Sequence, residues 1–494
     1  MFFEASARCR RSQHRNHGCY AVGLHREVRL MPQLSPRLCA RWRWMFAWAC
    51  LISMAVFSQT DAASTPAPKT PSGATAQKKS EAYKPPPQGR WRETANMTTA
   101  RSNHTATRLL SGQVLVVGGE SSDMSTATAE LFDPTANGGQ GAWTDAGSLN
   151  QRRVRHTATL LANGTVLVIG GMMNSGGYTD IAFTSVEVFA PAANHGLGAW
   201  NMAAPLQVGR WGHTATLLPT GKVLVVGGYT TLTKEDPGHV VDAIELYDPA
   251  ANAGQGASQI IGRLNPTHDP RNESDFPPEL YFPTATLLPS GAVLLVGNTE
   301  HERVLSSCEH KARHLTIAAD ERTVQTDPAS ETLYLCFVTA TRLSDGRVLV
   351  VPDSSPDSSS DSSLYTDIEN KELDKWARLY YQPRLYDDTM RGDARRGAWT
   401  EMAVPRRIGR HHRATLLPNG TVLVTGGGNS RKADVYDPAA PRGKTPWAAT
   451  AEMQSKREDH TATLLLNGTV LVVGGENRET GRLTSAEIYE PTPK

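Results

Sequence analysis

The sequence is poor in the features that identify most enzymes and membrane proteins. Only six of its 494 residues are cysteine, four of them within the first fifty, and aromatic residues make up 7%. No apolar run is long enough for an ordinary membrane-spanning helix. The Gly-x-Ser-x-Gly, P-loop and His-Glu-x-x-His motifs are absent. These absences remove the motif-based reasons to expect a serine hydrolase, a P-loop nucleotide site or a zinc protease.

An excess of charge of one sign is also missing from the main body of the chain. Residues 1–63 hold nine basic and three acidic residues, which leaves 42 basic and 46 acidic residues in the remainder. A mildly acidic body lacks the basic surface that binds nucleic acid. We therefore expect no nucleic-acid partner.

The N-terminal region has the order of an export signal. Three arginines precede an apolar run at 44–57, and small residues follow up to Ala62. This order predicts a signal peptide within 1–62, with Met31 as an alternative start of translation; an uncleaved anchor is the competing interpretation. Residues 63–88 have the Pro-, Ala- and Ser-rich composition of a linker. We expect a secreted or periplasmic protein, monomeric and without a membrane span after cleavage.

Two cysteines remain beyond the signal region. Cys308 and Cys336 form a disulfide candidate in an exported chain, and two free thiols in neighbouring strands are the alternative.

One phrase recurs along the rest of the chain at intervals of 48 to 74 residues. Its last copy reads HTATLLLNGTVLVVGG. Five good copies begin at His104, His156, His213, His412 and His460, and two weaker copies begin at Pro283 and Val338. The alternating TAT segment, the Asn-Gly type of turn and the apolar VLVV run predict two antiparallel strands joined by a tight turn.

Each copy is followed by two further predicted strands. The third ends in Asp-Pro or a similar pair, and the fourth opens with a tryptophan in four copies, at Trp143, Trp200, Trp399 and Trp447. The last copy stops after its third strand, and Gly89–Met97, with Trp91 in register, can supply the fourth. We therefore predict an all-β, seven-bladed propeller over 89–494 whose last blade is closed by the N-terminal strand.

This pattern resembles the kelch repeat superfamily over nearly all of residues 89–494. Among kelch proteins it is most similar to the central propeller of galactose oxidase-like proteins and to bacterial secreted kelch repeat proteins. The resemblance implies that the histidine-bearing strand is the innermost of each blade.

Charged residues recur together in the copies. An arginine precedes the histidine by three in four copies, and an acid occupies the third strand in five. The set is Arg101, His104, Glu130, Arg153, His156, Glu187, Arg210, His213, Glu245, His412, Asp434, Arg457, His460 and Glu487. We interpret it as buried ion pairs with ordered histidines, a structural role that needs no metal; a metal-binding ring of imidazoles is the alternative.

The copper chemistry of the resembled oxidases can be tested at single positions. The resemblance implies a Tyr-His pair at the start of one inner strand, and His411 and His412 occupy these positions. It also implies a Cys–Tyr crosslink and a ligand from a further, C-terminal domain, and the chain shows neither. We therefore expect no copper-oxidase activity and no cofactor.

Loop lengths indicate which face binds a ligand. The connections at 172–185, 229–242, 265–282 and 353–376 are long and all lie on the face that carries the Gly-Gly ends of the second strands. Two of them contain candidate binding residues, which are His268, Asp269, Asp275, Tyr281, Phe282, Asp353, Asp357 and Asp361. The aspartates could hold calcium, although a flexible serine-rich loop is the simpler interpretation.

Together these features favour an exported scaffold that binds a glycan or protein ligand through its long-loop face. The alternative is a propeller enzyme that acts on carbohydrate.

Overall fold

The computed structural model describes most of the chain from Gly89 onward. The described ranges are 89–174, 180–231, 239–264, 281–298, 309–328, 333–334, 338–352, 382–392, 395–403, 405, 408–441 and 443–492. The signal region 1–62, the linker 63–88, Cys308 and Cys336 lie outside them. No helix in these ranges is long and apolar enough to cross a membrane.

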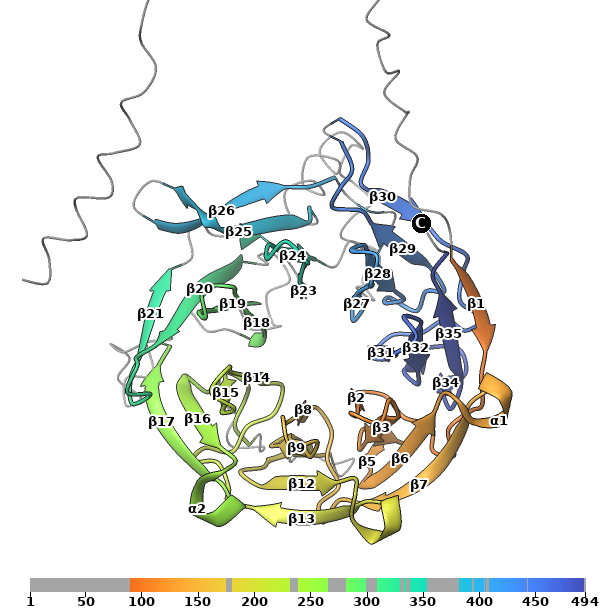
Figure 1. Cartoon of the computed structure of the whole chain (residues 1–494), viewed down its shortest axis with the longest axis horizontal. Helices are drawn as coiled ribbons and strands as arrows, with labels where there is room; N and C mark the ends of the chain where they lie inside the picture. The colour runs from red at the N-terminus through yellow and green to blue at the C-terminus, as the bar shows by residue number, and fades with distance from the viewer. Residues whose placement is uncertain are drawn as a thin grey trace, which may run out of the picture. The chain divides into compact units, whose positions relative to one another are not determined.

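Seven antiparallel sheets stand around a central channel, as predicted (Figure 1). Each sheet has four strands in meander order, and blade four adds a fifth. The first blade comprises β2 (Thr105–Arg108), β3 (Val114–Val117), β6 (Thr128–Asp133) and β7 (Ala142–Ser148). The second comprises β8 (Thr157–Leu160), β9 (Val166–Ile169), β12 (Val186–Ala190) and β13 (Ala199–Ala203). The third comprises β14 (Thr214–Leu217), β15 (Val223–Val226), β16 (Ala243–Asp248) and β17 (Ala257–Arg263).

The remaining blades follow the same plan. Blade four has β18 (Tyr281–Leu287), β19 (Val293–Asn298), β20 (Glu309–Ile317), β21 (Val324–Pro328) and β22 (Leu333–Tyr334). Blade five has β23 (Thr339–Arg342), β24 (Val348–Val351), β25 (Arg384–Gly392) and β26 (Arg395–Glu401). Blade six has β27 (Arg413–Leu416), β28 (Val422–Thr425), β29 (Ala433–Tyr436) and β30 (Trp447–Ala449). Blade seven has β31 (Thr461–Leu464), β32 (Val470–Val473), β35 (Ala486–Glu490) and β1 (Arg90–Glu93).

The N-terminal strand closes the ring, which confirms the sequence prediction. Strand β1 pairs antiparallel with β35, and Trp91 lies opposite Tyr489. The two rings are 5.1 Å apart, like the Phe132–Trp143 pair of the first blade at 4.9 Å. The first and last segments of the propeller therefore share one sheet.

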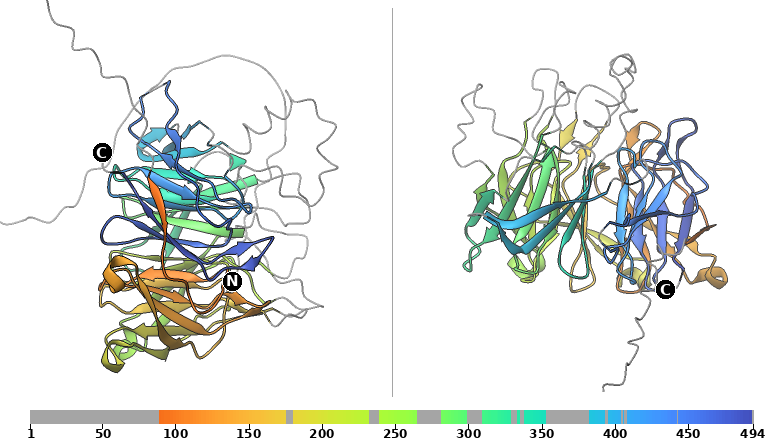
Figure 2. Two further views of the ribbon diagram at one scale, coloured as in Figure 1. Left: turned by 90° about the vertical axis from the view of Figure 1, so that its right-hand side faces the viewer. Right: turned by 90° about the horizontal axis from the view of Figure 1, so that it is seen from above.

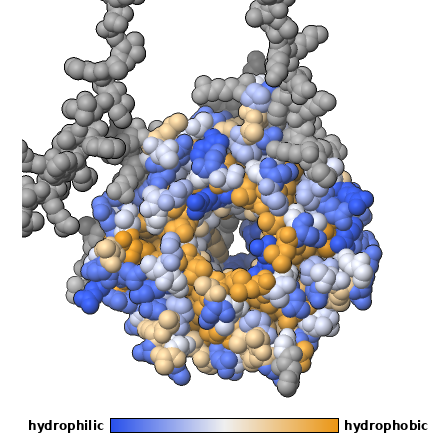
Figure 3. All heavy atoms as spheres, in the orientation of Figure 1, coloured by the Kyte–Doolittle hydropathy of each residue, from blue (hydrophilic) through white to orange (hydrophobic). Residues whose placement is uncertain are grey.

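The ring has two different faces. The turns between first and second strands lie on one face, which we call the turn face, together with the short helical turns α1 (Ala136–Gly139) and α2 (Ala251–Gly254) (Figure 2). A 3-10 turn at Asn194–Gly196 occupies the corresponding link of blade two. Figure 3 shows the channel opening among apolar residues on the turn face. Leu110 and Leu466, in turns between first and second strands, are each 67% exposed.

The opposite face, which we call the loop face, carries the ends of the second strands and the starts of the first. Its described connections contain three short hairpins. They are β4 (Glu120–Ser121) with β5 (Met124–Ser125), β10 (Met172–Met173) with β11 (Ile181–Ala182), and β33 (Glu476–Asn477) with β34 (Gly481–Arg482).

The core lies between the blades. The second strand of each blade is completely buried, with residues such as Val114, Leu115, Val116 and Val117 at 0% exposure. Its apolar side chains pack in both directions, against the preceding and the following sheet. The Gly-Gly pair that follows allows close approach of the next blade. A Cβ on Gly118, whose φ is +60°, would lie 2.7 Å from the Arg153 carbonyl oxygen.

Candidate binding site at the mouth of the channel

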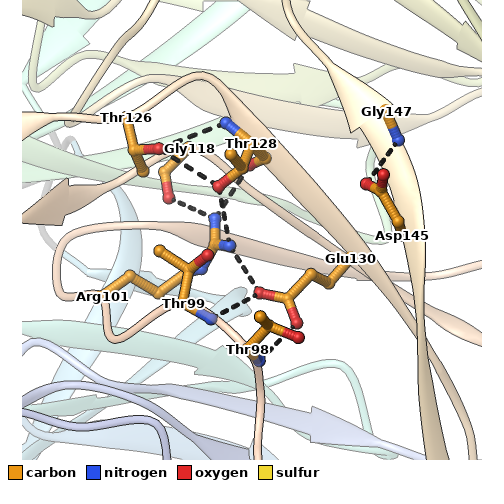
Figure 4. Close-up of polar contacts among 9 residues, drawn as sticks. All are labelled: Thr98, Thr99, Arg101, Gly118, Thr126, Thr128, Glu130, Asp145 and Gly147. Atoms are coloured by element: carbon orange, nitrogen blue, oxygen red, sulfur yellow. Dashed lines mark hydrogen bonds and ion pairs between the residues drawn. The ribbon is translucent and has the colours of Figure 1, made fainter.

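The recurring arginines and glutamates form buried ion pairs in the blades. Arg101 Nη2 is 2.7 Å from Glu130 Oε1, and both side chains are buried (Figure 4). Glu130 also accepts hydrogen bonds from the backbone nitrogens of Thr98 and Thr99, at 2.7 and 3.1 Å. Arg101 Nη1 donates to the Gly118 carbonyl oxygen at 2.8 Å. The pair thus connects the segment that precedes the first strand to the second and third strands of the same blade.

Three other blades repeat this arrangement. The buried Arg–Glu pairs are Arg153–Glu187, Arg210–Glu245 and Arg457–Glu487, each at 2.6 Å. In blade six Asp434 is buried in β29. Burial lowers the pKa of each of the four paired arginines, and the charge of the paired glutamate acts to raise it. The arrangement gives these residues a structural use within the ring.

The recurring histidines connect neighbouring blades. Nε2 of His156 shares a hydrogen bond of 2.9 Å with Oγ1 of Thr105 in the preceding blade. Four more such bonds, at 2.9 to 3.0 Å, are His104–Thr461, His213–Thr157, His412–Thr339 and His460–Thr425. Burial lowers the pKa of His156 to about 3 and that of His412 to about 4, so both are neutral at physiological pH. The Nε2 atom of each of these histidines is hydrogen-bonded to a threonine hydroxyl.

A cavity of about 590 Å³ occupies the loop-face end of the channel. Its wall contains the residue that immediately precedes the histidine position in every described copy. These residues are Asn103, Arg155, Gly212, Phe282, His411 and Asp459. Whereas the residues that follow the histidine position are nearly constant, these six differ in charge, size and polarity.

All six residues have a left-handed backbone. Their φ angles lie between +43° for Phe282 and +64° for Gly212. This region favours glycine and asparagine, and other residues adopt it at a cost of about 1–3 kcal/mol each. Backbone hydrogen bonds link them from blade to blade: Asn103 N donates to the Asp459 carbonyl and Arg155 N to the Asn103 carbonyl. The shared conformation brings one residue from each of six blades to the same cavity.

His411 and Asp459 form the polar side of the cavity. His411 Nδ1 is 2.9 Å from Asp459 Oδ2, and the side chains are 34% and 17% exposed. Burial acts to raise the pKa of Asp459, but the hydrogen bond from His411 and the charges of His411, Arg413 and Arg155 lower it overall. Asp459 is therefore ionised and held in place at neutral pH.

Aromatic side chains form another side of the cavity. Phe282 lines it, and Trp211 and Tyr229 stack behind with ring centroids 4.8 Å apart. Phe282 lies 5.8 Å from each of these rings. The Arg155 guanidinium lies over Trp211 and Phe282, at 5.2 and 5.4 Å from the ring centroids. Such a cation–π arrangement orders a long side chain at the edge of the cavity.

Of the predicted binding residues, the structure places Phe282 in this cavity. Tyr281 begins strand β18, and its side chain lies outside the described part. His268, Asp269, Asp275, Asp353, Asp357 and Asp361 also lie outside the described residues. Sequence reasoning missed Arg155, Arg413 and Asp459. The arginine at 413, within a phrase that has threonine at this position in the other copies, was a usable signal.

A copper site needs several nitrogen, oxygen or sulfur donors arranged around one ion. His412 Nδ1 lies 3.2 Å from the Gly409 carbonyl oxygen and Nε2 lies 2.9 Å from Thr339 Oγ1, so both ring nitrogens have protein partners. Within the described ranges no group of three or more His, Cys, Asp or Glu residues could hold a metal ion. The described residues therefore do not fit the copper site implied by the resemblance.

Known proteins share the fold at low sequence identity. No family model matches the chain. An aldehyde oxidase GLOX of Vitis pseudoreticulata is 25% identical over 158 residues, 31% of this chain and 26% of that protein. The match thus spans about a quarter of that relative's length.

The similar solved structures also have low sequence identity to this chain. A fungal alcohol oxidase of the AA5 family, in complex with copper, is 15% identical and has a TM-score of 0.52 over 83% of this chain and 77% of that one. The structure of YjhT has a TM-score of 0.45 at 14% identity, over 80% of this chain and 95% of that one. The chain has a seven-bladed β-propeller fold, with distant oxidase-like neighbours.

Proposed function

We propose that the protein is an exported propeller that binds a saccharide in the cavity at the loop-face mouth of its channel. The observation that carries this proposal is that six left-handed residues of different types, from six of the copies, line one cavity. Strained backbone conformations cluster at ligand-binding sites. Left-handed residues of different types at equivalent positions are therefore consistent with a binding site. The export signal pattern at 1–62 supports a location outside the cytoplasm.

The chemistry of the wall suits a saccharide. Phe282 offers an apolar surface on which the C–H face of a sugar ring can pack, and Asp459 with His411 offers an acceptor and a donor for hydroxyl groups. The volume of about 590 Å³ lies within the range of small-molecule sites. Most ligand-facing groups stand on first strands or directly before them, so little reorganisation is needed on binding.

A copper-dependent oxidase is the second candidate. It is favoured by the fold shared with the AA5 alcohol oxidase and by the partial match to the aldehyde oxidase. Two observations argue against it. His411 occupies the position where the oxidases have a tyrosine, and both ring nitrogens of His412 already have hydrogen-bond partners.

One experiment separates the two candidates. The purified full chain is applied to a glycan array, and its copper content is measured by mass spectrometry after incubation with copper. We expect saccharide binding without stoichiometric copper. Phe282→Asn, which keeps a side chain suited to the left-handed backbone, should abolish binding, and Leu466→Asn at the opposite mouth should not. Stoichiometric copper with alcohol or aldehyde oxidation, and no glycan bound, would overturn the proposal.

A further inference from the structure

One copy of the repeat carries an arginine where all others carry threonine. The residue that follows the histidine position is Thr105, Thr157, Thr214, Thr284, Thr339 or Thr461 in six copies. In the sixth copy it is Arg413, the first residue of the innermost strand β27. Arg413 lines the cavity.

A second substitution accompanies Arg413. In the first blade, Thr105 supplies the hydroxyl that bonds the histidine of the next blade. Blade six cannot do so with Arg413, and His460 instead bonds Thr425 Oγ1 at 2.9 Å. Thr425 lies directly opposite Arg413 in the sheet, at a position that is Val or Ile in the other copies. The Thr425 hydroxyl thus keeps the connection between blades six and seven although Arg413 replaces the usual threonine.

Arg413 forms no close ion pair with any described residue. Its Nε donates to the His460 carbonyl at 2.8 Å and its Nη1 to the His412 carbonyl at 3.3 Å. Among the described residues, no carboxylate oxygen lies within 4 Å of its guanidinium, and Asp459 acts on it only at longer range. A desolvated guanidinium in a cavity wall without a counter-ion favours an anionic ligand.

Arg155 adds to the positive field of the cavity. Its guanidinium lies over aromatic rings and, within the described part of the chain, makes no side-chain hydrogen bond. Two guanidinium groups and the one carboxylate of Asp459 thus line the cavity. Asp180 interacts electrostatically with Arg155 but is not part of the wall. The described lining residues therefore carry a net positive charge even with His411 neutral.

We propose that the saccharide bound in the cavity carries a carboxylate, as a hexuronate does, and that the Arg413 guanidinium pairs with it. This inference rests on the proposed saccharide-binding function. Phe282 packs against the sugar ring, Arg413 selects the acid, and Arg155 strengthens the attraction without direct pairing. Guanidinium suits the task because its donors match the two oxygens of a carboxylate.

The test compares ligands that differ only in charge. Binding of D-galacturonate and D-glucuronate to the full chain is measured by calorimetry, beside their methyl esters, the parent aldoses and lactate. We expect at least one uronate to bind about tenfold or more tightly than its methyl ester, the range of a charge-assisted hydrogen bond. Equal affinity for a uronate and its ester would overturn the inference and leave the saccharide function standing. Equal affinity for lactate and the uronates would overturn the saccharide function, and binding of none of them would overturn both.

Variants that restore the repeat pattern provide the second arm. Arg413→Thr with Thr425→Val gives blade six the residues of the other blades, so it should fold and should lose the preference for uronate over ester. Arg155→Asn should weaken uronate binding less. Arg108→Leu removes an arginine of another innermost strand that does not line the cavity, and should leave the preference unchanged. Retention of the full preference in the Arg413→Thr/Thr425→Val variant would contradict the assigned role.

Discussion

At the scale of single residues, the buried histidines make the ring sensitive to acid. Burial is the largest cause of the lowered pKa of His104, His156, His213, His412 and His460. The unfolded chain binds protons at these histidines below about pH 6.5, and the folded chain does not until about pH 3 to 4 for His156 and His412. Stability is therefore fully present above pH 6.5 and falls as the pH drops through this window.

The expected size follows from proton linkage. Each histidine should remove about 1.4 kcal/mol of unfolding free energy per pH unit below 6.5. Denaturant unfolding between pH 8 and pH 4 measures the slope, and His156→Gln should reduce it by about one proton. A stability that stays level from pH 7 to pH 4 would show that these histidines titrate normally in the folded chain.

At the scale of elements, strands β27 and β28 are coupled through Arg413 and Thr425. Thr425→Val alone leaves the buried His460 Nε2 without its partner and should cost about 1–3 kcal/mol. Adding Arg413→Thr restores a hydroxyl at the position used in other blades and should recover most of the loss.

A double-mutant cycle by thermal or denaturant unfolding checks this coupling. Val116→Ala in the first blade, distant from β27, serves as the independent partner for Thr425→Val. Additive effects of Thr425→Val and Arg413→Thr, with no recovery in the double variant, would mean that the two threonine positions are not interchangeable.

Strand β1 carries the closure of the ring. Deleting Gly89–Met97 removes the strand that pairs with β35, together with the buried Met97, and exposes a sheet edge. We expect the melting temperature to fall by about 5 °C or more, whereas deletion of 80–88, equal in length, should change it little. Unchanged melting by calorimetry after removal of β1 would show that closure adds no stability.

The strands could be predicted from the sequence because the chain contains seven versions of one blade that can be compared with one another. Turn residues, buried VLVV runs and the tryptophans of the fourth strands fix strand order, and Trp91 identifies the closing strand. The cavity was not predicted, because the side chains of Arg155, His411 and Asp459 meet only when distant copies are placed around one axis. The left-handed backbone that directs them there has no signature in residue type, since Phe, Arg and His adopt it here.

At the scale of the whole molecule, the closure of the ring and the central cavity both follow from the arrangement of the blades around one axis. Residues 80–494 form one compact unit, in which each blade contributes one strand to the channel wall. The repeated Arg–Glu pairs and His–Thr bonds hold the blades in register and leave the residue before each histidine to vary. A rigid frame with varied residues just before the first strands explains how a repetitive sequence forms a single asymmetric site.

The most direct test is the position of a bound saccharide. Crystals of the full chain or its secreted form are soaked with the tightest ligand from the array and solved. We expect electron density for the sugar between Phe282 and the His411–Asp459 pair, within hydrogen-bond distance of Asp459. Density on the outer edge of a blade or on the turn face, with the loop-face mouth of the channel empty, would contradict the site proposed for this propeller.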